Sequence, residues 1–178
     1  MGQIINKLSR IYIKKKVKVF MAGNPSSGRT TILYKWKNQK IEYYQPTLGF
    51  NVEHIVHNQV EFEIWDAGGG SAVRNIWIHY LQGVEALIAV LDSSDLKQDQ
   101  DYFQEQIKKL LANLPSNNLP FLILANKNDK YQASLEEIEK YVGIEKFKSQ
   151  IQYKIIYTNP FSGEGLTEAL DWLSQRFI

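Results

Sequence analysis

Hydrophobic and polar residues alternate along the chain in blocks that predict strands and helices in turn. Short apolar runs that stop at glycine, aspartate or asparagine are typical of buried strands, and apolar residues spaced three or four apart are typical of helices. The predicted strands cover residues 17–22, 50–56, 60–66, 86–92, 121–126 and 151–157. The predicted helices cover residues 29–37, 71–82, 99–113, 135–142 and 166–177. This order predicts an α/β fold, with a six-stranded, mostly parallel sheet and helices on both of its faces.

Two of the predicted strands form a hairpin. Residues 50–56 and 60–66 alternate apolar and polar positions on either side of His57, Asn58 and Gln59, as is typical of an antiparallel pair. The other strands are separated by helices and are therefore expected to run parallel. In such a sheet ligands bind beyond the carboxyl ends of the strands, so the chemistry of the protein is expected in the loops that follow them.

Length and composition restrict the class of protein. A chain of 178 residues with 44% apolar and 22% charged residues fits one globular domain. It contains no cysteine, which excludes disulfides and thiolate metal sites. It also has no apolar run near the roughly 18 residues of a membrane-spanning helix, and no signal peptide. We therefore expect a cytoplasmic protein, either soluble or peripheral to a membrane.

The first 18 residues carry a concentration of positive charge. They contain six basic residues and no acidic residue, whereas the rest of the chain carries a formal charge of about −4. The basic residues are Lys7, Arg10, Lys14, Lys15, Lys16 and Lys18. A basic arm on an acidic body is consistent with a membrane or nucleic-acid partner, and equally with a solvated tail. No RNA-binding signature accompanies the charge, so nucleic acid is not an expected partner.

The loop after the first predicted strand has the spacing of a phosphate-binding loop. Residues 23–30 read G-N-P-S-S-G-R-T and match the pattern G-x-x-x-x-G-K-[ST] except at Arg29, where the pattern has lysine. In such a loop, small residues let backbone N–H groups surround phosphate oxygens, and the next helix points its positive end at the same anion. Thr30 is placed to offer its hydroxyl to Mg²⁺. Alone this motif is weak evidence, because many strand-to-helix loops are rich in glycine.

Two further motifs follow in order, each at the end of a predicted strand. Asp66 begins the sequence D-A-G-G, a D-x-x-G arrangement in which the aspartate supports the metal through water and the amide of Gly69 meets the terminal phosphate. Residues 126–129 read N-K-N-D and fit N-K-x-D. There Asp129 accepts hydrogen bonds from N1–H and the 2-amino group of guanine, a donor pair that adenine lacks. Three motifs in this order indicate a site for a guanine nucleotide with Mg²⁺.

Several segments together resemble Arf and Arf-like (ADP-ribosylation factor) small GTPases. Residues 46–53, P-T-L-G-F-N-V-E, resemble the first switch of that family, and residues 65–69, W-D-A-G-G, resemble its second switch. Residues 79–83 (H-Y-L-Q-G) resemble the segment that follows. Residues 162–166 (S-G-E-G-L) resemble the C-terminal signature, which L-D-W-L at 170–173 continues. The resemblance covers essentially the whole chain and implies a Ras-like P-loop GTPase domain.

The resemblance also implies roles for individual residues. Thr47 would join Thr30 as a ligand of Mg²⁺ and would sense the terminal phosphate. Phe50, Trp65 and Tyr80 match the aromatic residues with which the family binds effector proteins, although large aromatic residues more often lie in a core. The expected nucleotide-binding residues are Gly23, Asn24, Ser26, Ser27, Gly28, Arg29, Thr30, Thr31, Thr47, Asp66, Gly69, Asn126, Lys127, Asp129, Asn159 and Pro160.

The N-terminus carries a second trait of the same family. Gly2 follows the initiator methionine, as N-myristoylation requires, although Asn6 stands where the usual pattern has serine or threonine. Apolar residues at positions 4, 5, 8, 11 and 12 share one helical face. We expect residues 1–16 to form an amphipathic basic helix, and residues 17–178 to form the GTPase domain. A lipid-modified glycine followed by this helix would anchor the protein to a membrane, and the alternative is a helix that stays docked.

Four residues depart from the family's pattern around the expected nucleotide. Arg29 keeps a positive charge but is bulkier and forked, so weaker binding of the β- and γ-phosphates, or its loss, is expected. Gly70 stands where the family has the glutamine that orients the attacking water, so hydrolysis is expected to be very slow or absent. Pro160 has no N–H for the guanine oxygen, and Pro25 removes one amide from the phosphate loop.

Two interpretations follow from these residues. In the first, the protein binds guanine nucleotide, has impaired intrinsic hydrolysis and presents its switch surface to partner proteins, as a switch that cycles between GDP and GTP with help from exchange and activating proteins; Thr30, Thr47 and Asp66 favour it. In the second, it is a degenerate GTPase that serves as a scaffold or as a subunit of a larger complex; Arg29, Gly70 and Pro160 favour that. The sequence identifies no catalytic residue.

Overall fold

The structure is a computed structural model, and it describes residues 13–38, 47–97, 99–114, 118–129 and 133–178. One six-stranded sheet runs through it, in the order β2-β3-β1-β4-β5-β6. The hairpin of β2 and β3 is antiparallel, and the other neighbouring strands are parallel. The predicted six-stranded, mostly parallel sheet is therefore confirmed.

The strands agree with the sequence prediction to within two residues at each end. They are β1 (Lys15–Gly23), β2 (Phe50–His57), β3 (Val60–Ala67), β4 (Val84–Asp92), β5 (Leu119–Asn126) and β6 (Ile151–Thr158). The helices are α1 (Arg29–Trp36), α2 (Ser71–Arg74), α3 (Gln100–Ala112), α4 (Leu135–Val142) and α5 (Leu166–Ser174), with the 3₁₀ helices η1 (Trp77–Tyr80) and η2 (Ile144–Lys146). Along the described parts of the chain, every helix is too short or too polar to cross a membrane.

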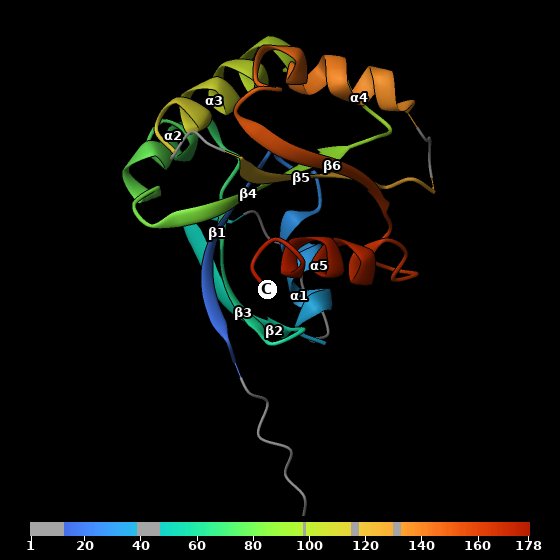
Figure 1. Cartoon of the computed structure of the whole chain (residues 1–178). Helices are drawn as coiled ribbons and strands as arrows, with labels where there is room; N and C mark the ends of the chain where they lie inside the picture. The colour runs from blue at the N-terminus through green and yellow to red at the C-terminus, as the bar shows by residue number, and fades with distance from the viewer. Residues whose placement is uncertain (1–12, 39–46, 98, 115–117, 130–132) are drawn as a thin grey trace, which may run out of the picture.

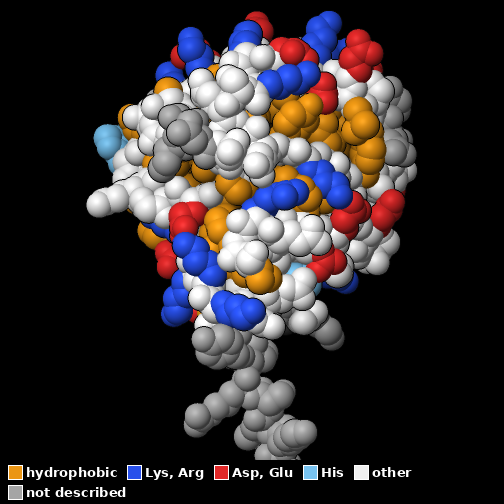
Figure 2. Space-filling model, viewed as in Figure 1, with side chains coloured by type: hydrophobic (Ala, Val, Ile, Leu, Met, Phe, Trp, Pro, Cys, Tyr) orange, Lys and Arg blue, Asp and Glu red, His pale blue; other side chains and the backbone are white. Residues whose placement is uncertain are grey.

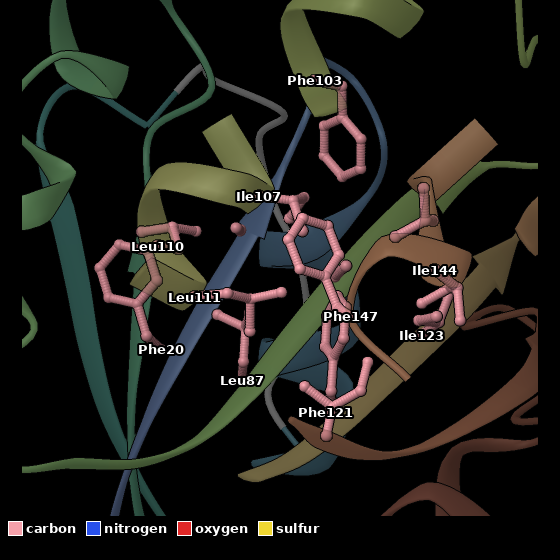
Figure 3. Packing of buried hydrophobic residues seen from close by; sticks show 14 of the residues in the cluster. Phe20, Leu87, Phe103, Ile107, Leu110, Leu111, Phe121, Ile123, Ile144 and Phe147 are labelled. Atoms are coloured by element: carbon pink, nitrogen blue, oxygen red, sulfur yellow. The ribbon is translucent and has the colours of Figure 1, made fainter. Parts of the chain in front are cut away.

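Helices cover both faces of the sheet (Figure 1): α3 and α4 lie on one face, and α1 and α5 lie on the other. On the first face, Phe103 and Ile107 of α3 pack in one cluster with Phe20 and Phe121 of the strands (Figure 3), and all four side chains are fully buried. The strand β5 is buried along its whole length, as is typical of a parallel strand covered on both sides. On the surface over α3 and α4, basic and acidic side chains stand next to one another (Figure 2).

The prediction of one helix over residues 71–82 is wrong. The segment forms the short helix α2 and the separate turn η1. The break lets the indole of Trp77 enter the core, where it packs edge-on against Phe20 and donates its N–H to the carbonyl of Gly68 at 3.2 Å. The β-branched and aromatic residues around Trp77 have modest helix propensity, so this tertiary contact outweighs the helical pattern.

Three other helices are shorter than predicted, and α1 ends one residue early, at Trp36. α3 begins at Gln100 because Asp99 has a left-handed backbone, with a φ of 55°. α5 ends at Ser174, and the chain then turns so that the ring of Phe177 packs edge-on against Phe62 at a centroid distance of 6.5 Å.

The predicted N-terminal helix does not extend to residue 16, because β1 already begins at Lys15. Lys15 pairs with Val60 in the sheet, and its ammonium lies 2.6 Å from the carboxylate of Glu85. This end of the basic arm therefore belongs to the sheet. Gly2 and the predicted helix up to residue 12 lie outside the described residues.

The tip of the β2–β3 hairpin is fastened to α5. The Nε2 of His57 donates to Oδ1 of Asp171 at 2.7 Å, and the amide of Asn58 donates to the same oxygen at 2.9 Å. The hydroxyl of Ser174 lies 3.4 Å from the carbonyl of His57. The hydrogen bond from His57 holds the pKa of Asp171 below its ordinary value, against a small opposing effect of burial. One carboxylate thus fixes the hairpin tip against the C-terminal helix.

Replacing Asp171 with asparagine is expected to lower the thermal stability at neutral pH. Because the folded-state pKa of Asp171 is depressed, its contribution is present above the unfolded value of about 3.9 and is lost as the pH falls through the folded value. The difference in Tm between the wild type and Asp171→Asn should therefore shrink as the pH is lowered from 7 toward the folded-state pKa. A thermal melt series in pH checks this, with Asp95→Asn as the control at an exposed aspartate. A constant difference would show that the ionised form of Asp171 is not what stabilises the hairpin tip.

Candidate functional site

The predicted motifs lie in loops beyond one edge of the sheet. The strands β1, β3, β4, β5 and β6 run parallel, so their carboxyl ends face the same side. Residues 24–28 follow β1, residues 68–70 follow β3, residues 127–129 follow β5 and residues 159–165 follow β6. The topology thus brings segments from both halves of the chain to one place.

The loop between β1 and α1 has the backbone of an anion cradle. Gly28 has a φ of 93°, and a Cβ there would collide with the amide of Asn126, so glycine is required. The N–H groups that open α1 have no carbonyl partner earlier in the helix and are available to an anion. Ser27 is 1% exposed, and its hydroxyl has no hydrogen-bond partner among the described residues. A phosphate oxygen would satisfy this buried hydroxyl.

Arg29 extends into this cradle. Its Nε donates to Oδ1 of Asp66 at 3.0 Å, and its Nη1 donates to the carbonyls of Gly23 and Asn24. The side chain is only 7% exposed. Burial lowers the pKa of Arg29, and the carboxylate of Asp66 opposes that shift. A guanidinium starts so far above neutral pH that it keeps its charge here.

Asp66 also joins two threonines from different segments. Its Oδ2 accepts the hydroxyl of Thr30 at 2.6 Å, and the hydroxyls of Thr30 and Thr47 lie 2.9 Å apart. Burial raises the pKa of Asp66, although Arg29 and the threonine hydroxyls oppose the rise. Neighbouring ligands of an octahedral Mg²⁺, with bonds of about 2.1 Å at a right angle, are about 3 Å apart. The two hydroxyls therefore fit the metal role that the resemblance implies.

Asn126 connects the phosphate loop to β6. Its amide nitrogen donates to the carbonyl of Ser27 at 2.8 Å, and its amide oxygen accepts the hydroxyl of Thr158 at 3.1 Å. The residue is 1% exposed. Since both ends of the amide are engaged within the protein, Asn126 acts by positioning the phosphate loop.

Lys127 and Asp129 follow β5 in different surroundings. The ammonium of Lys127 lies 2.5 Å from Oδ2 of Asp92. Burial alone would raise the pKa of Asp92, but hydrogen bonds from Lys127 and Ser94 hold it below its ordinary value. Asp129 is exposed, and its carboxylate makes no ion pair with any described residue. It is therefore available to accept from a ligand such as guanine.

The loop after β6 satisfies its own amide groups. Pro160 is buried and has no N–H. The N–H groups of Phe161 and Ser162 both turn back to Oδ1 of Asn159, at 2.9 Å and 3.4 Å. These two amides are engaged inside the loop.

The adjacent glycines of the second-switch segment differ in surroundings. Gly69 is buried against the phosphate loop, where a Cβ would lie 2.7 Å from the nitrogen of Pro25 and 2.8 Å from the carbonyl oxygen of Gly23. Gly70 is exposed, and a Cβ there would meet no described atom within 4 Å. The first position excludes a side chain, whereas the second has room for one.

Arg74 and Tyr141 belong to the surroundings of the site, although no motif pointed to them. Arg74 is 5% exposed, and its Nη1 donates to Oδ1 of Asn24 at 3.2 Å. The amide of Asn24 donates to the hydroxyl of Tyr141 at 2.7 Å, and burial raises the pKa of Tyr141 to about 12. This buried network links the phosphate loop to α2 and α4. The only signal in the sequence is a lone arginine shortly after the D-x-x-G motif.

The aromatic residues Phe50, Trp65 and Tyr80 form one cluster. The ring centroids of Phe50 and Tyr80 are 4.0 Å apart, and those of Trp65 and Tyr80 are 5.9 Å apart. The ammonium of Lys18 lies 4.3 Å from the centroid of the Trp65 ring. All three aromatic side chains are half-buried and pack against the larger core. They contribute to the core and still expose part of their surface.

The predicted site residues are not all in direct contact. Hydrogen bonds join Gly23, Asn24, Arg29, Thr30, Thr47 and Asp66 into one cluster, and Ser27 is bonded to Asn126. Ser26 is exposed in the loop with a φ of 60°, and Thr31 is half-buried on the first turn of α1. Asp129 and Asn159 lie in the two loops beyond β5 and β6, which pair up to Asn126 and Thr158.

Comparisons with known proteins match both the sequence and the fold. The sequence profile of the ADP-ribosylation factor family (Arf) matches residues 1–177. Among solved structures, the chain is similar to the Arl6 (BBS3) small GTPase from Trypanosoma brucei, determined with the bound nucleotide analogue GppNp. The two chains are 29% identical, the match covers 90% of this chain and 96% of the other, and the TM-score is 0.77.

Proposed function

The chain belongs to the ADP-ribosylation factor family of small GTPases, and we propose that it binds guanine nucleotide, hydrolyses GTP poorly and presents its switch surface to partner proteins. The observation that carries the proposal is the bonded cluster of Arg29, Thr30, Thr47 and Asp66, together with an exposed glycine at position 70, four residues after Asp66. The cluster retains the groups that bind phosphate and metal, while Gly70 brings no side chain to the reaction.

Nucleotide binding is supported by the fit of several separate groups. The phosphate loop provides backbone N–H groups and the buried hydroxyl of Ser27. Asp129 provides an exposed carboxylate that suits guanine rather than adenine. Thr30 and Thr47 would hold Mg²⁺, which offsets phosphate charge when bound. The buried ion pair of Arg29 and Asp66 joins the start of α1 to the end of β3 at this site.

Poor hydrolysis is supported by the surroundings of Gly70. Attack on the terminal phosphate requires a residue that orients the water, and this family uses a glutamine at the position of Gly70. No described side chain fills the space that a Cβ at Gly70 would enter. The nucleotide would then persist as GTP unless a partner protein supplied the missing group.

Partner binding is supported by the exposed aromatic and aliphatic surface around the switch segments. Phe50, Trp65 and Tyr80 are half-exposed, and Leu48, two residues before Phe50 in the first-switch segment, is 94% exposed. Apolar surface of this kind on a soluble domain is typical of a protein interface. The partner class follows from the family, whose members bind effector proteins.

The arm before β1 extends the proposal to membranes. The sequence of Gly2, the apolar positions between residues 4 and 12 and the basic residues beside them has the pattern of a two-part anchor, in which an acyl chain and an amphipathic segment would act together. With this arm the protein would be cytoplasmic and peripheral to a membrane.

Restoring the glutamine in the variant Gly70→Gln is expected to raise the single-turnover rate of GTP hydrolysis about tenfold or more, because it supplies the group that orients water. The wild type, purified as the full chain, should carry guanine nucleotide in a near one-to-one ratio, mostly as GTP. Chromatography of the nucleotide released by denaturation and a phosphate-release assay measure the two quantities. The control Gly70→Ala adds a Cβ at this position without an amide and should leave the slow rate unchanged.

Two results would argue against the proposal. Fast hydrolysis by the wild type, equal to that of Gly70→Gln, would show that another group orients the water. Purified protein that carries no nucleotide and binds none when GTP or GDP is added would support the second candidate, a degenerate GTPase that acts as a scaffold. The observation that favours this second candidate is that Arg29 already uses Nε and Nη1 within the chain.

A further inference from the structure

We propose that Arg29 takes over the role of a divalent cation as the counter-charge of Asp66, so that this chain retains a nucleoside phosphate without Mg²⁺. The proposal rests on the proposed function, because it concerns the same nucleotide site. It differs from the metal role that the sequence suggests for Thr30 and Thr47: their hydroxyls fit Mg²⁺, but in this chain the metal becomes dispensable.

The first step is the direct pairing of Arg29 with Asp66. The Nε of Arg29 lies 3.0 Å from Oδ1 of Asp66, and the two side chains are 7% and 0% exposed. A buried carboxylate needs a nearby cation or hydrogen-bond donors, since its charge is otherwise strongly disfavoured. Here Arg29 provides the charge at Oδ1, and Thr30 donates to Oδ2 at 2.6 Å. Groups of the chain itself therefore contact both oxygens of Asp66.

The second step is the excess of positive charge around the loop. Arg74 is 5% exposed, and its Nη1 donates to the side chain of Asn24, whose backbone carbonyl accepts from Arg29. Its nearest carboxylate is that of Asp99, 3.7 Å away and 50% exposed. The buried part of the cluster thus has two guanidinium groups and the single carboxylate of Asp66. Such a cluster attracts an anion, because charges interact strongly where water is excluded.

The third step is that the nitrogens of the Arg29 guanidinium donate to different acceptors. Nε serves Asp66, and Nη1 serves the carbonyls of Gly23 and Asn24. Nη2 has no hydrogen bond to a described residue, so its two N–H groups remain for a phosphate oxygen. A lysine ammonium is a single point charge and cannot reach a carboxylate, the loop carbonyls and a phosphate through three separated nitrogens. Arginine at position 29 can therefore neutralise Asp66 and bind phosphate together.

The test compares how fast a fluorescent GDP leaves the full chain in Mg²⁺ and in excess EDTA. For the wild type we expect the two dissociation rates to agree within about twofold, because Arg29 supplies the charge in both buffers. For Arg29→Lys we expect EDTA to accelerate dissociation about tenfold or more, since Asp66 then depends on the metal. A wild type that loses GDP tenfold faster in EDTA would overturn the inference while leaving nucleotide binding, and hence the proposed function, in place.

A second measurement uses the wild type alone and keeps the test decisive if Arg29→Lys does not fold. GDP should raise the Tm by the same amount in EDTA as in Mg²⁺, because the stabilisation by a ligand grows with the logarithm of its affinity, which we expect to be the same in both buffers. A rise that appears only with Mg²⁺ would overturn the inference. If neither buffer supports any binding of GDP or GTP, both the inference and the proposed function are wrong.

Discussion

Replacing Trp77 with alanine is expected to lower the free energy of unfolding by about 3–5 kcal/mol, the usual range for removing a fully buried tryptophan. Trp77 is 1% exposed and packs edge-on against Phe20 at a centroid distance of 5.8 Å. The truncation leaves a cavity under the second-switch segment, which the surrounding strands cannot close. Urea denaturation, followed by circular dichroism, measures the change.

The same substitution should also disturb the site, because Trp77 holds both switch segments indirectly. Its indole N–H donates to the carbonyl of Gly68, and the N–H of Gly68 donates to the carbonyl of Gly49 at 2.8 Å. We therefore expect Trp77→Ala to release guanine nucleotide faster than the wild type. Ile78→Ala is the control, because Ile78 is 41% exposed in the same turn and its truncation should cost less than about 1 kcal/mol. Equal losses for the two variants would contradict the packing role assigned to Trp77.

The strands could be predicted from the sequence because their signal is local. β1, β4 and β5 are apolar runs that stop at Gly23, Asp92 and Asn126, and these stops mark the carboxyl edge at which the loops meet. The hairpin could be predicted for a similar reason, since its two strands alternate around a polar turn. A pattern confined to a few neighbouring residues is sufficient for these elements.

The segment after β3 could not be predicted in the same way. Its apolar residues fit a helical period, but the position of Trp77 is decided by contacts with Phe20 and Gly68, which lie elsewhere in the chain. Where a large side chain fills a core, tertiary packing overrides local propensity. The prediction of a single helix failed here because the contacts of Trp77 that determine the structure are made with residues distant in the sequence.

The candidate site, too, is predictable from local sequence patterns only in part. Motif spacing predicts which loops carry Thr30, Asp66 and Asp129, and the parallel sheet then brings these loops to one edge. Spacing does not predict where a substituted side chain goes. The sequence indicates that Arg29 is too forked for the slot of a lysine, but its pairing with Asp66 appears only when the two strand ends are placed side by side.

Replacing Asp66 with asparagine is expected to lower the free energy of unfolding by about 3–5 kcal/mol, because it leaves the Arg29 charge buried without a partner. The opposite variant, Arg29→Gln, should cost less at neutral pH. Burial already raises the pKa of Asp66, so a lone Asp66 can take up a proton, whereas a lone guanidinium cannot release one. Loss of the Asp66 carboxylate therefore lowers the free energy of unfolding more than loss of the Arg29 guanidinium.

The double variant Arg29→Gln with Asp66→Asn separates the interaction energy of the two side chains from the contributions that each makes through its other contacts. It removes both buried charges and keeps amide groups that can hydrogen-bond, so it should recover most of the stability lost in Asp66→Asn, with a coupling energy of about 2–3 kcal/mol. Urea denaturation of the four proteins at pH 7 gives this coupling. In Arg29→Gln the folded-state pKa of Asp66 lies higher still, so this variant alone should gain stability relative to the wild type as the pH falls. Additive losses in the double variant, together with no pH effect in Arg29→Gln, would mean that Arg29 and Asp66 stabilise the fold independently.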